Sequence, residues 1–167
     1  VRSIYIIGAP GSGKSTAMAR LLEGWTVGPY SKWCREVYGH VLEHPEKGRG
    51  LYLGHLRPEY PGTDALSLSV APRALEWLES LPLLGMDVLY GEGARLSHIG
   101  FLRALHEATD LTVVYLDVPP EVAAERRLHR PGKQLSEQFC RAQTSKAANV
   151  AAACREAGIK VLEKVPD

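Results

Sequence analysis

The sequence has few cysteines, no long apolar run and almost no net charge. Its three cysteines are odd in number and lack the paired spacing of a zinc site, so neither a disulfide framework nor a cysteine-based metal site is favoured. No run approaches the roughly 20 apolar residues that a membrane-spanning helix needs. Lys and Arg number 20 and Asp and Glu 19, which leaves a net charge of +1 and little overall attraction to nucleic acid or lipid. We expect a cytoplasmic protein without membrane contact.

The 167 residues have the length and the average composition of one globular domain, so we expect a single domain over 1–167. Short apolar runs alternate with helical patterns, and this alternation predicts an α/β fold, a doubly wound parallel five-stranded sheet with helices on both faces. Residues 25–70, rich in Gly and Pro, are expected to form an insertion over the sheet. The expected strands are 3–7, 51–53, 88–90, 111–116 and 159–165.

The strongest motif is GAPGSGKS at residues 8–15, which matches G-x-x-x-x-G-K-[ST] between an expected strand and an expected helix. Glycines let backbone N–H groups converge on a phosphate chain, and the helix N-terminus adds its positive dipole end. Lys14 is expected to reach the β- and γ-phosphates, and the Ser15 hydroxyl to ligate Mg²⁺. The motif therefore predicts a site for ATP and Mg²⁺. The residues expected to bind this cofactor are Gly8, Gly11, Ser12, Gly13, Lys14, Ser15 and Thr16.

An arginine-rich helix is expected after the fourth strand, within residues 119–135. Arg126 and Arg130 lie one helical turn apart, so two guanidinium groups can close over one phosphate chain. The alternative is a solvated basic face paired with neighbouring glutamates. The segment resembles the lid of small nucleoside and nucleotide kinases such as thymidylate kinase. That resemblance implies that Arg126 also binds the cofactor and that both arginines stabilise the transferring phosphoryl group.

Glu92 is the preferred carboxylate because it follows the expected strand 88–90, and ligands of parallel sheets bind beyond the carboxyl ends of the strands. Lys14 is expected at the same edge. The turn formed by residues 91–95 resembles the Glu-Arg-Ser turn of deoxyribonucleoside kinases, with Arg95 present and the Ser missing. Glu92 is expected to accept the substrate hydroxyl proton or to hold a water on Mg²⁺. The alternative is a surface pair between Glu92 and Arg95.

Asp64 is a second candidate carboxylate, in a segment rich in hydroxyl groups. Thr63 and Asp64 are compatible with a simple helix cap. In the functional interpretation, Asp64 binds or deprotonates the acceptor hydroxyl, Thr63 contacts the acceptor, and Arg57 binds its phosphate.

Half of the aromatic residues lie between residues 25 and 60, interleaved with Lys and Arg. Flat bases stack on such rings while the cations bind phosphate, so the pattern favours a nucleobase or nucleotide acceptor. A hydrophobic cluster inside the insertion is the alternative explanation, and the two are compatible. The residues expected to bind the acceptor are Tyr30, Trp33, Arg57, Thr63, Asp64 and Arg95.

The succession of residues 54–70, followed by Pro72 and Trp77, resembles small phage P-loop kinases, some of which act on hydroxymethylated thymine analogues. With the phosphate loop and the arginine helix, the likeness spans nearly the whole chain. It implies a nucleotide-kinase type of fold and ATP-dependent phosphorylation of the hydroxymethyl group of 5-hydroxymethyluracil in DNA, with the base flipped out or single-stranded, for later hypermodification. A free nucleoside or nucleotide kinase of thymidylate type and a nucleotide-binding regulator without transfer chemistry are the alternatives.

Overall fold

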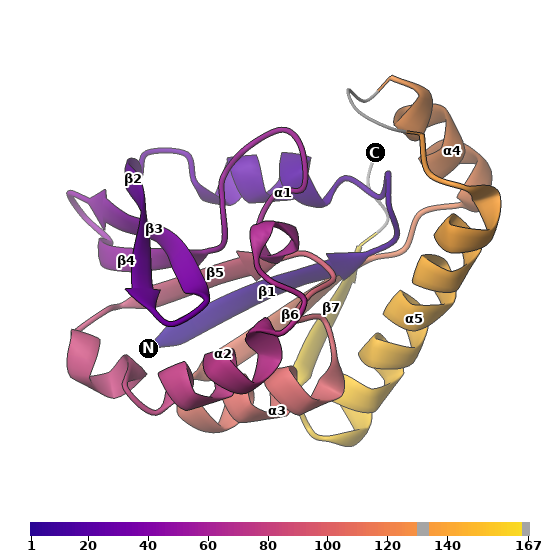
Figure 1. Ribbon diagram of the computed structural model, residues 1–167. Helices are drawn as coiled ribbons and strands as arrows, with labels where there is room; N and C mark the ends of the chain where they lie inside the picture. The colour runs from indigo at the N-terminus through magenta and orange to yellow at the C-terminus, as the bar shows by residue number, and fades with distance from the viewer. Residues whose placement is uncertain (130–133, 165–167) are drawn as a thin grey trace.

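The computed structural model describes residues 1–129 and 134–164, which form a mixed sheet flanked by helices (Figure 1). The strands are β1 (Arg2–Gly8), β2 (Thr26–Cys34), β3 (Val37–His44), β4 (Gly48–Leu53), β5 (Val88–Glu92), β6 (Asp110–Leu116) and β7 (Lys160–Lys164). The helices are α1 (Lys14–Leu21), α2 (Val70–Leu78), α3 (Ile99–Ala108), α4 (Pro120–Leu128) and α5 (Glu137–Glu156), with short 3₁₀ turns η1 (Thr63–Ala65) and η2 (Leu81–Leu84). Among these described helices, none is both long enough and apolar enough to cross a bilayer.

Within the described residues the sheet has seven strands in the order β2-β3-β4-β5-β1-β6-β7, which corrects the expectation of five parallel strands. The run from β4 to β7 is parallel, as expected, whereas β2 and β3 add an antiparallel hairpin at one edge. The hairpin lies in the segment expected to be an irregular insertion. Gly28 and Pro29 interrupt β2, whose register with β3 shifts between Val27 and Tyr30, so no regular alternation of apolar residues marks this strand.

Helices cover both faces of the sheet, because successive residues of each strand point to opposite sides. Ile6 of β1 packs with Met18 of α1 on one face. Tyr5 and Ile7 face the other side, in the larger cluster that contains buried residues of α2, α3 and α5. Figure 1 shows α1 on one side of the sheet and α2 and α3 on the opposite side. Because the five strands from β4 to β7 are parallel, their carboxyl ends meet at one edge, where the candidate site lies.

Candidate functional site

The phosphate loop joins β1 to α1 at the carboxyl edge of the sheet, and two of its glycines adopt left-handed backbone conformations. Gly11 has φ +83° and Gly13 has φ +97°. A Cβ atom on Gly11 would lie 2.4 Å from the Ala123 carbonyl oxygen of α4, so only glycine fits there. The loop is therefore narrow, sharply turned and in direct contact with α4.

The N-terminus of α1 has the features of an anion site. Gly13 at the N-cap provides no side-chain cap, and no acidic residue lies in the first turn, so the first backbone amides are left for another acceptor. The Ser12 hydroxyl oxygen is buried and has no hydrogen-bond partner among the described residues. Lys14 is anchored within the loop, where its Nζ donates to the carbonyl oxygens of Gly8 at 2.8 Å and Ala9 at 3.1 Å. These groups fit a phosphate chain.

A magnesium ion would have to share its coordination with phosphate oxygens and water. No group of three or more His, Cys, Asp or Glu side chains in the described part of the chain is arranged to hold a metal. Mg²⁺ usually takes only one or two protein ligands beside a nucleotide, and the exposed Ser15 in the first turn of α1 suits that arrangement.

Helix α4 supplies two arginines to the outside of the loop. The Arg126 Nη1 atom donates to the Ser12 carbonyl oxygen at 3.3 Å, and the Arg127 Nη1 atom donates to the Pro10 carbonyl oxygen at 2.9 Å. Arg130, expected to be the partner of Arg126, lies outside the described residues, and so does part of the expected 119–135 lid. Helical spacing does not indicate Arg127, because its partner lies in the loop 117 residues away.

Glu92 ends β5 beside the phosphate loop. The parallel register pairs Glu92 with Ile6 of β1, two residues before Gly8, and the Glu92 side chain is only 1% exposed. The Tyr52 hydroxyl of β4 donates to the Glu92 Oε1 atom at 2.9 Å. Burial, and then the Glu92 carboxylate, raise the pKa of Tyr52, so this phenol keeps its proton as a donor. Tyr52 belongs to the aromatic residues expected to stack on bases, and its contact with Glu92, 40 residues away, has no local signal in the sequence.

Asp64 lies against the turn that follows Glu92. Its Oδ1 atom accepts the Ala94 backbone N–H at 2.8 Å, so this carboxylate caps the neighbouring turn rather than its own. Thr63 is fully buried and shares a hydrogen bond of 3.1 Å with the Tyr5 hydroxyl, which donates to the Gly93 carbonyl oxygen at 2.8 Å. Thr63 was expected to contact the acceptor, and in this structure its hydroxyl bonds to Tyr5 of β1 and so links η1 to that strand.

Two more side chains hold the same turn. The Arg95 Nε atom donates to the Leu66 carbonyl oxygen at 3.2 Å, and the Lys146 Nζ atom of α5 donates to the Ala94 carbonyl oxygen at 3.1 Å. Arg95 therefore fixes the backbone beside Asp64, whereas it was expected to bind the acceptor. Lys146 was missed, because nothing in the pattern of α5 indicates a contact 52 residues away. Together these bonds bring Asp64 and Glu92 to one place.

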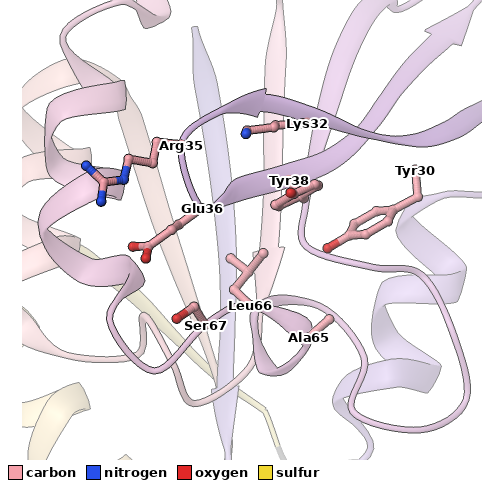
Figure 2. Close-up of a pocket in the computed structure, with 8 residues that line it drawn as sticks. All are labelled: Tyr30, Lys32, Arg35, Glu36, Tyr38, Ala65, Leu66 and Ser67. Carbon is pink, nitrogen blue, oxygen red and sulfur yellow. The ribbon is translucent and has the colours of Figure 1, made fainter.

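A cleft of about 300 Å³ opens between the β2–β3 hairpin and the segment after η1 (Figure 2). Tyr30, an expected acceptor residue, lies in its wall, and its ring stacks on Tyr38 and on His55, with the Tyr30 and His55 ring centroids 4.0 Å apart. The residues that line the cleft are Tyr30, Lys32, Arg35, Glu36, Tyr38, Ala65, Leu66 and Ser67. One side of the cleft is formed by Ala65, Leu66 and Ser67, which directly follow Asp64 in the chain.

Two other expected acceptor residues lie outside this cleft. Trp33 stacks on Trp77 of α2 with ring centroids 5.2 Å apart and packs against the larger core cluster. A large ring at this position gains more from covering apolar surface than from facing water. Arg57 is exposed in the loop after β4, and burial followed by the charge of Arg57 lowers the pKa of His55. The aromatic pattern of the insertion therefore serves both packing and the cleft.

Comparison with known proteins supports the fold and identifies the family. Among solved structures, an unliganded sugar kinase from Janibacter sp. HTCC2649 superposes with a TM-score of 0.56 at 16% identity, over 99% of this chain and 85% of that chain. At this identity the likeness concerns the fold alone. No curated protein matches the sequence. The model of the family described as P-loop Nucleotide Kinase3 matches residues 1–167, and the chain therefore belongs to this family.

Proposed function

We propose that the protein is an ATP-dependent kinase that transfers the γ-phosphoryl group to a hydroxyl group of a nucleobase or nucleotide. The observation that carries this proposal is that Glu92 ends β5 beside β1, the strand that leads into the phosphate loop, while Asp64 directly precedes Ala65 in the wall of the cleft. Hydrogen bonds to Tyr52 and to the Ala94 N–H fix their orientation. A kinase needs this order of parts, because the acceptor hydroxyl must meet the γ-phosphorus in line with the leaving oxygen.

In the proposed reaction, the amides of the phosphate loop hold the triphosphate and Lys14 exchanges its carbonyl partners for phosphate oxygens. Arg126 turns from the Ser12 carbonyl to the γ-phosphoryl group. The acceptor oxygen bonds to phosphorus, the bond to ADP breaks, and the hydroxyl proton passes to a carboxylate. Asp64 is the better placed for that role because it is half-exposed beside the cleft, while Glu92 holds water on the phosphate side. Mg²⁺, when bound, offsets charge on the phosphates.

The acceptor we favour is the hydroxymethyl group of 5-hydroxymethyluracil in DNA. Two features support it: the likeness of residues 54–70 to phage kinases of this kind, and the stacked Tyr30 and Tyr38 rings in the cleft. Base stacking on aromatic rings contributes roughly 1–3 kcal/mol per base. The cleft lies at the surface, so the base must be unpaired or flipped out of a duplex to enter it.

A free nucleoside or nucleotide is the second candidate acceptor. The cleft volume of about 300 Å³ is at the lower end for ligand pockets and fits one small molecule. The net charge of +1 also provides little general attraction for a DNA strand. A nucleotide-binding regulator would keep the phosphate loop without needing the two carboxylates at the cleft.

The test is phosphoryl transfer from γ-labelled ATP to a panel of acceptors, namely free nucleosides, free nucleotides and DNA containing 5-hydroxymethyluracil. We expect label on the modified DNA. Lys14→Ala should lose about 3 kcal/mol of transition-state stabilisation, a rate loss of about a hundredfold. Arg20→Ala, at the exposed end of α1, is the control and should retain activity.

Label on free nucleotides alone would favour the second candidate. Nucleotide binding without transfer to any acceptor would favour the regulator and contradict the kinase. Equal rates for wild type and Lys14→Ala would exclude the proposed role of the loop lysine.

A further inference from the structure

Glu36 has an unusual backbone for its residue type. It lies in the turn between β2 and β3, where Cys34 pairs with Val37, and its φ angle is +65°. Glycine or asparagine adopts this left-handed conformation at lower cost than glutamate. Strained non-glycine residues cluster at functional sites, where the surrounding structure holds them. Glu36 is therefore a candidate for a role that a turn alone would not require.

The Glu36 carboxylate is held at the wall of the cleft. The Ser69 hydroxyl donates to its Oε1 atom at 3.0 Å, and Ser69 in turn shares a hydrogen bond of 2.9 Å with Ser67. Figure 2 shows the carboxylate on the side of the cleft nearer Ser67, with the Tyr30 hydroxyl directed into the space from another side. One carboxylate oxygen is thus engaged by Ser69, and the group stays oriented.

The cleft also contains a positive charge, opposite in sign to the Glu36 carboxylate. Lys32 of β2 lines the same space, and no ion pair within 4.0 Å joins Lys32 to Glu36 in the described structure. The Tyr38 ring, stacked on Tyr30, lines the same space as the two charged side chains and provides a flat apolar surface there. An ammonium group only donates hydrogen bonds and a carboxylate only accepts them. The cleft therefore suits a flat ligand with an acceptor and a donor on its edge.

We propose that Glu36 determines acceptor specificity by accepting an N–H group from the edge of a heterocyclic base. Lys32 donates to a carbonyl oxygen beside that N–H, and the ring lies on Tyr38. The acceptor class is then a base with an N–H next to a carbonyl, as in uracil. This inference rests on the proposed function in taking the cleft as the acceptor site. A site built to bind a donor rejects an analogue without it, because the bound analogue covers the half-buried Glu36 carboxylate and gives it no hydrogen-bond partner.

The test is calorimetric binding of two probes, 5-hydroxymethyl-2′-deoxyuridine 5′-monophosphate and its N3-methyl derivative, which lacks the N–H. Wild type should bind the first about 10- to 100-fold more tightly, as expected for a hydrogen bond to a charged group. Glu36→Gln keeps an oxygen for Ser69 and turns an amide donor to the ligand, so this preference should disappear. Glu43→Gln, on the exposed side of β3, is the matched control and should retain it.

If Glu36→Gln fails to fold, as judged by its thermal unfolding midpoint, Glu36→Asn replaces it. Asparagine tolerates the left-handed backbone and is too short to place its amide where the carboxylate lies. Equal binding of both probes by wild type would overturn the proposal, as would no binding of either probe or a full preference in the Glu36 variant.

Phosphoryl transfer is scored separately. A preference that depends on Glu36, without transfer to these probes or to DNA containing 5-hydroxymethyluracil, would refute the kinase and leave this inference standing. Equal transfer to both probes would support the kinase and overturn this inference.

Discussion

Two buried tyrosines hold the candidate-site edge of the sheet in place, and neither lines the cleft. Tyr5 of β1 and Tyr52 of β4 are almost fully buried, and their hydroxyl groups donate to Gly93 and Glu92 respectively. Burial is the main cause that raises the pKa of both phenols, so they remain donors at any physiological pH. Tyr52 therefore orients Glu92 and Tyr5 holds the next residue, Gly93, from the strands on either side of β5.

Tyr52→Phe should reduce kcat by about tenfold with little effect on the KM for ATP. The change removes one hydrogen bond from a buried carboxylate and leaves the phosphate loop intact. The free energy of unfolding should fall by about 1–3 kcal/mol, the cost of removing a buried partner. Steady-state kinetics and denaturant unfolding measure both effects. Tyr60→Phe, which alters an exposed ring, is the control, and an unchanged kcat would show that Glu92 needs no such support.

At the residue scale, the sequence predicts where a residue lies in the fold when a motif or a strand direction defines the position, but it carries no signal for long-range contacts. The loop residues and Glu92 were placed at the same edge from spacing alone. Thr63 was expected to face the acceptor, but its hydroxyl bonds to Tyr5, 58 residues away. Arg127 and Lys146 were missed for the same reason, because their partners are determined only when the elements pack.

Helix α4 acts as a support for the phosphate loop. Ala123 is buried against Gly11, and Arg127 reaches the Pro10 carbonyl oxygen. In the proposed reaction Arg126 leaves the Ser12 carbonyl for phosphate, so Arg127 and the packing of Ala123 on Gly11 keep α4 on the loop.

Arg127→Met should weaken nucleotide binding about tenfold, because a charge-assisted hydrogen bond to the loop is lost while the apolar stem remains. Titration with ADP and the KM for ATP measure the change. Arg103→Met, on the exposed side of α3, should leave both values unchanged. A normal affinity in the Arg127 variant would mean that the loop holds its shape without α4.

Helix α3 begins at a histidine cap that responds to pH. The His98 Nδ1 atom accepts the Phe101 backbone N–H at 3.2 Å, and burial followed by the charge of Lys146 lowers the pKa of His98 below its usual 6.5. The unfolded chain therefore binds this proton more readily than the folded one. The stabilisation is present above pH 6.5 and is lost as the pH falls below it.

The free energy of unfolding of the wild-type protein should decrease between pH 7 and pH 5. The free energy of unfolding of the His98→Asn variant should decrease by a smaller amount over the same range. Asparagine caps a helix without titrating in this range. Urea denaturation at both pH values makes the comparison. An identical decrease in the two proteins would assign the pH dependence to other groups.

Element types were predictable where each strand is buried on both faces. β1, β4, β5 and β6 are largely buried and read as short apolar runs, whereas β7, at the edge of the sheet, is mostly exposed. The β2–β3 hairpin was not predictable in the same way, because its alternation is broken at Gly28 and Pro29 and its aromatic residues suggest a binding surface as readily as a core.

Over the whole molecule, the hairpin is joined to the main body through aromatic packing. Trp33 of β2 stacks on Trp77 of α2, and Ser69 bonds to Glu36 at the turn. These contacts link the edge of the sheet to the helical layer, so the hairpin and the phosphate loop should unfold together.

Trp33→Ala should lower the free energy of unfolding by about 2–4 kcal/mol, the range for deleting a large packed ring. Wild type should show one transition that coincides in tryptophan fluorescence and far-ultraviolet circular dichroism. The Trp33→Phe variant keeps a flat ring at this position and should recover part of the free energy of unfolding that Trp33→Ala loses. Two separate transitions in wild type would mean that the hairpin is an independent unit.

The broken ladder of β2 also affects how the protein behaves in concentrated solution. β2 is the last strand on its side of the sheet, its register shifts around Gly28 and Pro29, and Lys32 is exposed farther along. Proline has no N–H to offer, and a charged side chain is costly to cover. A strand from a second molecule therefore meets no continuous row of donors, which protects the chain against amyloid-like aggregation along this edge.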